Sequence, residues 1–314
     1  MSDRRKILVT CPPMLGLIEE FANDFEAKGL DFVTAPVVQV MTEAELIDML
    51  PAHDGWIIGD DPATAAVLEA GAAGKLRAIV KWGVGVDNVD FDAAGRLGLR
   101  STNTPGVFGP EVADLAMNYV SGLARFSFFI DREIRQKCNW PKPAGISLAN
   151  KNVGLVGFGD IGRNTAKRLL AADMRVVVYD PFFNAVKGME VTRARWPEGL
   201  SELDFLVFTA PLNDQTRHML HRGLLDQVKP GVRIVNVGRG PVIEEQALTD
   251  GLKNGVIHSV GLDVFEEEPL SADSPLRAYP YNIFGSHNGS NTVDAVRRVS
   301  RMAIDIIGGY LEDE

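Results

Sequence analysis

Three side chains of different chemistry follow apolar runs in the second half of the sequence. Arg239 lies in NVGRG, Glu268 lies in GLDVFEEEP, and His287 lies in FGSH. Taken singly, each has an ordinary interpretation, as a solvated arginine, part of a charged edge, or a structural histidine. Taken together, the guanidinium can bind a carboxylate, the imidazole can exchange a proton, and the glutamate can orient the imidazole. This combination suits hydride transfer to an α-keto acid.

A glycine pattern near the middle of the chain indicates the hydride carrier. VGLVGFGDIGRNTA contains G-x-G-x-x-G as Gly157, Gly159 and Gly162, after an apolar run and at the start of a helical pattern. That context is what a dinucleotide-binding turn requires, and it disfavours a glycine-rich turn without a ligand. The three glycines would permit the tight turn, the approach of the pyrophosphate and close helix packing, while the helix N-terminus attracts phosphate.

The next apolar run ends in Asp180, eighteen positions after Gly162. A carboxylate at this place accepts hydrogen bonds from both hydroxyls of the adenosine ribose and repels a 2′-phosphate. The residues that follow, PFFN, offer no arginine to neutralise such a phosphate. The sequence therefore predicts NAD rather than NADP as the cofactor.

The elements that must position these residues follow from hydrophobic patterning. Short apolar runs alternate with longer helical patterns, such as those at 42–50 and 110–126. Strands are predicted in two series, at 6–10, 31–35, 55–59 and 76–83, and then at 152–159, 175–180, 203–210, 232–238, 258–265 and 282–287. The runs are continuous rather than alternating, which is typical of parallel strands covered on both faces. We expect two doubly wound parallel-sheet α/β domains of the Rossmann or flavodoxin type.

Composition excludes several classes of protein. The chain has 314 residues, 46% of them hydrophobic and 24% charged, with a formal net charge of −10 and a pI near 5.1. An acidic surface disfavours nucleic acid and anionic membranes as partners, and no run approaches the ~20 apolar residues of a membrane span. Two cysteines without metal-ligand spacing favour a reducing compartment and predict no metal site. The charged start and short apolar run predict a first strand rather than a signal peptide, so we expect a cytoplasmic protein.

Seven motifs, in order, resemble those of the D-isomer-specific 2-hydroxyacid dehydrogenases, especially the 3-phosphoglycerate dehydrogenase branch. They are GVGVDNVD, NTPG, GLVGFGDIG, APLNDQT, NVGRG, GLDVFEEEP and SHNGS, and they extend from about position 81 to the C-terminus. The resemblance implies an NAD-dependent dehydrogenase that interconverts a D-2-hydroxy acid and its 2-keto acid. Residues 1–75 match the family only in general pattern.

The resemblance also implies that one domain is inserted into the other. A substrate-binding domain would comprise residues 1–102, completed by a returning helix in 289–314, and residues 103–288 would form the NAD-binding Rossmann domain. The family pairs subunits through the region of the 110–126 helix, so we expect a homodimer. An inserted nucleotide domain explains why the glycine fingerprint lies so far along the chain.

Roles for the site residues follow from the same resemblance. Arg239 is expected to bind the substrate carboxylate and polarise its carbonyl, His287 to act as general acid in reduction, and Glu268 to bond the other ring nitrogen. Further cofactor contacts are expected at Asp160, Ile161, Ala210, Pro211, Val237, Gly238, Asp263 and Gly289, besides Arg239 and His287. Asp263 is expected near the nicotinamide carboxamide.

The substrate is less narrowly defined by the sequence. Substrate contacts are expected at Lys81, Gly83, Val84, Gly85, Asn103 and Arg239, with backbone N–H groups of the 83–85 loop facing the substrate carboxylate. By the resemblance, Lys81 keeps a cation at a position that receives a phosphate, and 3-phosphoglycerate is the leading candidate. Asp60 and Asp61, at a strand end where a phosphate-binding arginine is expected, would repel it. The alternatives are a glyoxylate/hydroxypyruvate-type reductase and, from another class, an NAD(H)-sensing corepressor-like binding protein.

Overall fold

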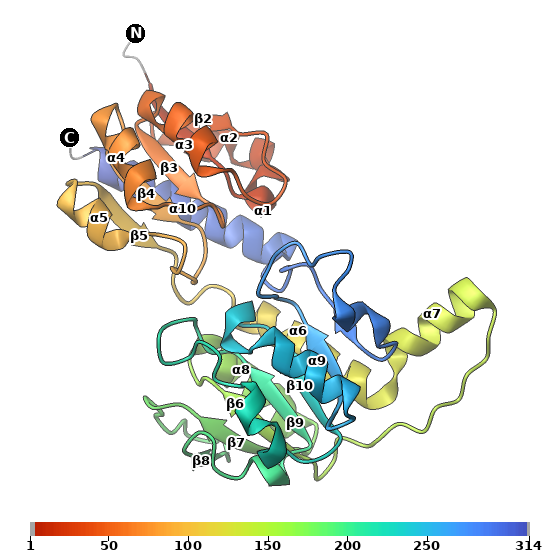
Figure 1. Cartoon of the computed structure of the whole chain (residues 1–314). Coiled ribbons are helices and arrows are strands. Elements are labelled where there is room, and N and C mark those ends of the chain that lie inside the picture. The colour runs from red at the N-terminus through yellow and green to blue at the C-terminus, as the bar shows by residue number, and fades with distance from the viewer. Residues whose placement is uncertain (1–3, 313–314) are drawn as a thin grey trace. The chain divides into compact units, whose positions relative to one another are not determined.

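The computed structural model describes residues 4–312, which divide into two compact units (Figure 1). The first unit contains the described residues up to Phe108 and those from Asn291 onward, and the second unit is Gly109–Ser290. The boundaries expected after 102 and 288 lie six and two positions earlier. Residues 103–108 belong to the first unit because they bond within it. Thr104 N–H donates to Lys81 O at 3.1 Å, and the Phe108 ring packs on Trp82 at 5.2 Å.

The first unit contains a five-stranded parallel sheet in the order β2-β1-β3-β4-β5, the flavodoxin-like order. Its strands are β1 (Arg5–Val9), β2 (Leu30–Thr34), β3 (Gly55–Ile58), β4 (Ala78–Lys81) and β5 (Arg100–Asn103). Leu8, Trp56 and Ile79 from the central strands are fully buried. The strand β5 was not predicted, because the half-buried edge segment RSTN contains no apolar run.

The helical elements of the first unit cover this sheet. They are α1 (Pro12–Leu15), η1 (Ile18–Phe21), α2 (Ala22–Ala27), α3 (Glu43–Met49), η2 (Leu50–Ala52), α4 (Ala65–Ala73), α5 (Phe91–Arg96) and α10 (Val293–Glu312). The helix α10, the last element of the chain, packs against β3 and β4 (Figure 1). Its buried residues Val299, Ala303 and Ile307 recur every four positions, so one apolar face meets the sheet.

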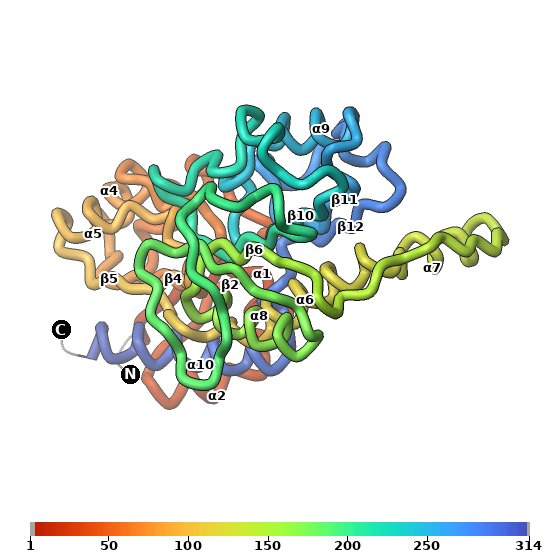
Figure 2. Tube along the Cα trace, turned by 90° about the horizontal axis from the view of Figure 1, so that it is seen from below, coloured from red at the N-terminus to blue at the C-terminus, as the bar shows by residue number. Residues whose placement is uncertain are grey.

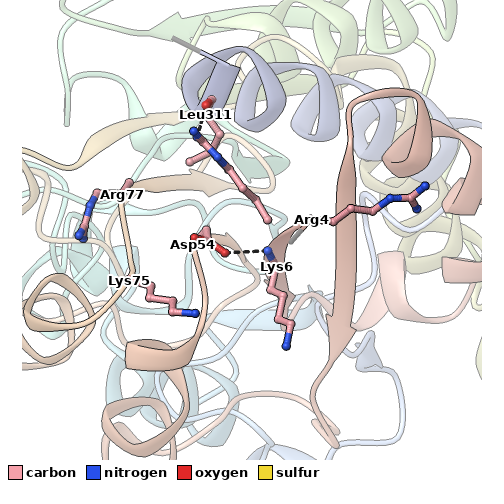
Figure 3. A pocket seen from close by; sticks show the side chains of 7 residues that line it. Arg4, Lys6, Asp54, Lys75, Arg77 and Leu311 are labelled. Atoms are coloured by element: carbon pink, nitrogen blue, oxygen red, sulfur yellow. Dashed lines mark hydrogen bonds between the residues drawn. The ribbon is translucent and has the colours of Figure 1, made fainter. Parts of the chain in front are cut away.

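A hollow of about 320 Å³ opens where β1, β3 and β4 begin (Figure 3). It is lined by Arg4, Arg5, Lys6, Asp54, Lys75, Arg77 and Leu311. Arg5 donates to the carbonyl of Leu311, and Arg100 donates to that of Tyr310 at 3.0 Å. Arginines at this place satisfy the last carbonyls of α10 and complement the negative end of its dipole. Of the cations that line the hollow, Arg5 therefore serves the end of this helix.

The second unit contains a seven-stranded parallel sheet in the order β12-β11-β10-β9-β6-β7-β8. Its strands are β6 (Asn152–Val156), β7 (Arg175–Tyr179), β8 (Thr192–Ala194), β9 (Phe205–Phe208), β10 (Val232–Asn236), β11 (Ile257–Leu262) and β12 (Ile283–Phe284). This is the Rossmann arrangement, in which the order reverses between β6 and β9 and a crevice forms at their carboxyl ends. The strand β8 was not predicted, because the edge segment TRA is largely exposed.

Helices pack around this sheet, the longest being α6. They are α6 (Gly109–Arg125), α7 (Ser127–Lys137), α8 (Asp160–Ala171), η3 (Leu200–Glu202), η4 (Arg222–Gln227), η5 (Gly240–Val242), α9 (Glu245–Lys253) and η6 (Pro275–Ala278). The helix α6 packs on α8 and along β10 and β11. It ends at Arg125, and the φ of 58° at the next residue, Phe126, breaks the helical path before α7, which was not predicted. Both α7 and the segment after it project from this unit (Figure 2).

Candidate active site

The three predicted catalytic residues follow three neighbouring strands. Arg239 comes three residues after β10, Glu268 comes six after β11, and His287 comes three after β12. Because carboxyl ends of adjacent parallel strands meet at one edge of a sheet, the three side chains converge there. His287 Nδ1 lies 2.8 Å from Glu268 Oε2, and His287 Nε2 lies 3.5 Å from a terminal nitrogen of Arg239. The structure thus brings the predicted triad together.

The glutamate fixes the orientation of the imidazole ring. A carboxylate accepts hydrogen bonds, so a proton on Nδ1 of His287 faces Glu268, and Nε2 faces Arg239. The other oxygen of Glu268 accepts from the backbone N–H of Phe265 at 3.0 Å, which holds the carboxylate in place. The side chains of His287 and Glu268 are 23% and 24% exposed. The pair is sheltered but open to a small molecule.

The loop that carries Arg239 depends on a residue that sequence reasoning missed. Asn236, the last residue of β10, is 1% exposed. Its amide nitrogen donates to Arg239 O at 2.9 Å, and its amide oxygen accepts from Gly238 N–H at 3.0 Å. One side chain therefore closes the turn in both directions. The sequence feature that could have indicated this role is the asparagine inside the apolar run RIVNVG. A buried side-chain amide needs hydrogen-bond partners nearby, and the adjoining turn supplies them.

The loop that carries His287 is held by Asp263. His287 has a φ of 54°, in the left-handed region that few side chains adopt. Its N–H donates to Asp263 O at 2.7 Å, and the N–H groups of Asn288 and Gly289 donate to the two carboxylate oxygens at 3.1 and 2.8 Å. Burial raises the pKa of Asp263, and these two N–H groups oppose the rise. The predicted contact of Asp263 with the nicotinamide carboxamide stays a prediction, and its carboxylate oxygens bond the backbone of this loop.

The glycine fingerprint forms a tight turn after β6. Gly157 has a φ of 93°, and a Cβ there would lie 2.8 Å from Ala210 N in the loop after β9. A Cβ at Gly162 would overlap the carbonyl of Gly157, so the start of α8 packs directly on the turn. A Cβ at Gly159 would meet nothing within 4 Å, which leaves this backbone open beside the first turn of α8. Open N–H groups and a helix N-terminus fit a pyrophosphate.

Asp180 follows β7 at the same edge of the sheet. Its two oxygens accept from Phe158 N–H at 2.6 Å and Phe182 N–H at 2.7 Å. Each oxygen keeps acceptor capacity for a ribose hydroxyl. The adjacent sequence contains no arginine, but β8 brings Arg193 next to this turn, where it donates to Pro181 O at 3.4 Å. The sequence did not predict this cation, because the pairing of β7 with β8, and not proximity in sequence, places it beside Asp180.

The remaining predicted cofactor residues lie in neighbouring loops of the second unit. Asp160 and Ile161 begin α8, Ala210 and Pro211 follow β9, and Val237 and Gly238 follow β10. The last two loops touch, because a Cβ at Gly238 would lie 2.7 Å from Ala210 O. Gly289 follows His287 and is buried. These residues and the fingerprint turn share the carboxyl edge of one sheet.

The substrate residues predicted in the first unit lie at the carboxyl ends of β4 and β5. Lys81 is 4% exposed at its side chain, and Nζ lies 3.1 Å from Asp60 Oδ1. Asn103 donates to Val84 O at 3.2 Å. Gly83 N–H donates to a Thr104 hydroxyl at 2.7 Å, so that amide is already bonded within the unit. Val84 is 40% exposed, and the neighbouring Gly85 is half-buried.

The prediction that both Asp60 and Asp61 repel a phosphate is wrong for Asp61, which is buried. Asp61 is 0% exposed. It accepts from the hydroxyl of Thr10, from Met41 N–H at 2.8 Å and from Gly59 N–H at 3.2 Å. Asp61 therefore faces inward, while Asp60, whose side chain is 40% exposed, pairs with the lysine. The two neighbours differ because a strand end turns successive side chains in different directions.

Comparison with known proteins gives a consistent assignment. Residues 117–289 match the model of the D-isomer specific 2-hydroxyacid dehydrogenase, NAD binding domain. A hydroxypyruvate reductase of Thermotoga maritima is 35% identical over 81% of this chain and 84% of that protein. A D-3-phosphoglycerate dehydrogenase of Archaeoglobus fulgidus is 32% identical over 96% of this chain and 56% of that protein.

Solved structures agree with the fold. The TT0316 protein of Thermus thermophilus superposes with a TM-score of 0.84 at 29% identity, covering 98% of this chain and 97% of that one. The apo D-lactate dehydrogenase of Escherichia coli superposes with a TM-score of 0.84 at 26% identity, covering 98% of each chain. Among residues 4–312, no helix has the length and apolar character needed to cross a membrane. The chain belongs to the D-isomer specific 2-hydroxyacid dehydrogenase family and is an NAD-dependent oxidoreductase that interconverts a 2-hydroxy acid and its 2-keto acid.

Proposed function

We propose that His287 is the general acid for keto-acid reduction and the general base in the reverse direction. The observation that carries this proposal is the contact of its two ring nitrogens with opposite charges, Glu268 at 2.8 Å and Arg239 at 3.5 Å. Glu268 fixes the tautomer and stabilises the imidazolium. Nε2 is then the atom that delivers a proton to the developing alkoxide of the substrate.

Arg239 binds the substrate carboxylate and polarises the carbonyl in this proposal. A guanidinium has a fixed fork of donors that matches a carboxylate in two parallel hydrogen bonds. Arg239 also lies beside the proton donor, so an anchored carboxylate would leave the adjacent carbonyl within reach of His287. Holding both groups in one geometry lowers the entropic cost of the reaction.

NAD fits the second unit along the fingerprint turn, with its pyrophosphate at the start of α8 and its ribose at Asp180. The supporting observations are the open backbone at Gly159 and the carboxylate that two N–H groups hold in place. When bound, the nicotinamide supplies or accepts the hydride. The loops after β9, β10 and β12 would line its other end, where the triad lies.

For the substrate, we propose a short, unphosphorylated 2-keto acid of the glyoxylate or hydroxypyruvate type. The second candidate is 3-phosphoglycerate, whose 2-keto form is 3-phosphohydroxypyruvate. Lys81 is the cation expected to receive a phosphate, but Asp60 at 3.1 Å already neutralises it. Relatives named hydroxypyruvate reductase and glyoxylate/hydroxypyruvate reductase, at 34–36% identity, point in the same direction. Relatives named D-3-phosphoglycerate dehydrogenase, at 32%, support the second candidate.

The direct test is a reduction panel followed by NADH absorbance. Glyoxylate, hydroxypyruvate, pyruvate and 3-phosphohydroxypyruvate are compared by kcat/KM. We expect the two short acids to exceed the phosphorylated one at least tenfold. A preference for 3-phosphohydroxypyruvate would select the second candidate, and no turnover with any keto acid would favour a corepressor-like binding role.

We also propose that the protein is a cytoplasmic homodimer. Support for a dimer comes from the projecting α7 region, where Trp140 is 76% exposed and Phe128 and Ile134 are each 40% exposed. Apolar side chains of this size gather at association surfaces. Support for the cytoplasm comes from the unpaired Cys11 and Cys138. Sedimentation at micromolar concentration tests the dimer, and a monomer of 34.2 kDa would contradict it.

A further inference from the structure

A tyrosine on α6 reaches the carboxylate that holds the His287 loop. Tyr119 is 3% exposed and packs against β11. A Cβ added at Gly261 in that strand would lie 2.9 Å from the Cβ of Tyr119. Gly261 and Asp263 are two positions apart, so they face the same side of the chain as it leaves the sheet. The ring of Tyr119 therefore passes over the glycine and brings its hydroxyl to Asp263.

An absent side chain makes room for this contact. A Cβ at Gly285, just after β12, would overlap both the Tyr119 hydroxyl and Asp263 Oδ1. The two oxygens thus meet in the space above Gly285, two residues before His287. Gly285 is itself fixed, because its N–H donates to Leu262 O at 2.7 Å. Three segments of the chain, α6 and the ends of β11 and β12, converge on one carboxylate.

The pKa of Tyr119 decides which group of the contact is the hydrogen-bond donor. Burial and the charge of Asp263 raise the pKa of Tyr119, so its phenol stays protonated and donates. The carboxylate then has two backbone donors, the N–H groups of Asn288 and Gly289, and the phenol that shares the space above Gly285 is the third group able to donate to it. A carboxylate buried to 2% exposure needs such donors, because each one lost leaves part of its desolvation cost uncompensated.

We propose that Tyr119 is a positioning residue for the reaction: its hydroxyl holds Asp263 as the anion that fixes the left-handed loop of His287. This inference rests on the proposed role of His287. The charged or titratable groups that face Asp263 are Tyr119 from α6, His287 from the loop after β12 and Glu268 from the loop after β11. Of these, only Tyr119 supplies a neutral donor whose removal leaves the acid–base pair unaltered.

The test is Tyr119→Phe, assayed over pH in the direction of keto-acid reduction. Without the phenol, the Asp263 anion loses a donor and its pKa rises further, so the acidic limb of kcat/KM moves to higher pH. We expect kcat near neutral pH to fall about tenfold, the loss for one hydrogen bond to a charged group. NADH affinity, measured by fluorescence, changes less than twofold, because the fingerprint turn is intact.

A matched control is Tyr179→Phe. Tyr179 is also 3% exposed and donates to a backbone carbonyl, that of Glu198, at 2.7 Å. Its loss removes a buried hydroxyl bond of the same unit without touching Asp263. The control should lower the melting temperature without moving the acidic limb. A Tyr119→Phe profile that coincides with wild type, or a Tyr179→Phe limb that moves equally, would overturn the proposal.

A second variant tests the shared space. Gly285→Ala places a methyl group against both oxygens in wild type, but against Asp263 alone in the Tyr119→Phe background. The activity loss from Gly285→Ala should therefore be smaller in that background, and strictly additive losses would contradict the geometry. His287→Ala is assayed in parallel. If it stays active, both the proposed function and this inference fail; if it is inactive while Tyr119→Phe behaves as wild type, only this inference fails.

Discussion

Two buried aspartates, one in each unit, have closely similar surroundings. Asp61 and Asp263 are 0% and 2% exposed, and each follows a buried parallel strand. Each accepts two backbone N–H groups and contacts one hydroxyl, from Thr10 in the first unit and from Tyr119 in the second. Burial raises the pKa of both carboxyls.

The difference lies in what each carboxylate holds. Asp61 joins the turn after β3 to Met41, just before α3, and its hydroxyl partner Thr10 also accepts from the Trp56 indole at 2.9 Å. Asp263 holds the loop that presents His287 to the outside. The same local device thus supports the interior in one unit and a reactive imidazole in the other. A buried, fully bonded carboxylate identifies a fixed loop, and the residues on that loop decide the function.

The strongest test of this contrast is His287→Ala. Removing the general acid should lower kcat for keto-acid reduction by roughly 10²–10⁴ while NADH still binds. Steady-state kinetics and fluorescence titration of NADH measure the two effects. A variant that keeps more than a tenth of the wild-type kcat would show that His287 is not the general acid. Asp263 would then have only a structural role, like that of Asp61.

Paired substitutions compare the two aspartates directly. An asparagine replaces an acceptor oxygen with a donor, which leaves an N–H group unsatisfied at either site and costs about 1–3 kcal/mol of unfolding free energy. Asp263→Asn should also lower kcat about 10- to 100-fold, because the His287 loop loses its anchor. Asp61→Asn should leave kcat of the folded protein within about twofold. Urea unfolding and kinetics on both variants check this, and equal activity losses would erase the distinction.

Because the pKa of Asp61 is raised, the stability difference between wild type and Asp61→Asn should depend on pH. A carboxyl whose pKa is higher in the folded state contributes stability that is fully present below its unfolded value, near the ordinary 3.8, and is lost as pH rises through the folded value. The stability difference between wild type and Asp61→Asn should therefore shrink as pH increases across that interval. A difference that grows with pH would mean that the folded protein stabilises the anion.

Glu268→Gln examines a carboxylate that touches the imidazole itself. A neutral partner stabilises the imidazolium less, so the pKa of His287 should fall. The acidic limb of kcat/KM for hydroxy-acid oxidation, which requires neutral imidazole, should then move to lower pH, as should the alkaline limb for reduction. Profiles in both directions measure this. An unmoved profile would make Glu268 part of a charged edge.

Asp180 extends the comparison to a carboxylate that is open. It accepts two backbone N–H groups, as Asp61 and Asp263 do, but it is half-buried and keeps acceptor capacity for a ligand. We expect kcat/KM for NADH to exceed that for NADPH, and Asp180→Ala to narrow the gap about tenfold. Equal use of NADPH by wild type would contradict this role and would point to Arg193 as the residue that receives the 2′-phosphate.

The central strands, the glycine fingerprint and the candidate catalytic residues could be predicted from local sequence. The central strands were predicted because buried parallel strands are continuous apolar runs, and the fingerprint because its glycines meet requirements within a few residues. Arg239, Glu268 and His287 were identified because each follows such a run, and neighbouring strands carry their ends to one edge. Asp180 followed from its distance along the chain from the glycines.

Tertiary structure alone decided the features that depend on which surfaces meet. The edge strands β5 and β8 have no apolar run, because pairing on one side is enough to form them. No pattern in the sequence shows that Asp61 turns inward while Asp60 pairs with Lys81. Tyr119 and Asp263 are 144 positions apart, and their contact exists because α6 packs along β11. Hydrophobic periodicity fixes which side of an element is buried, whereas the partner of a buried polar group is fixed only when the elements pack.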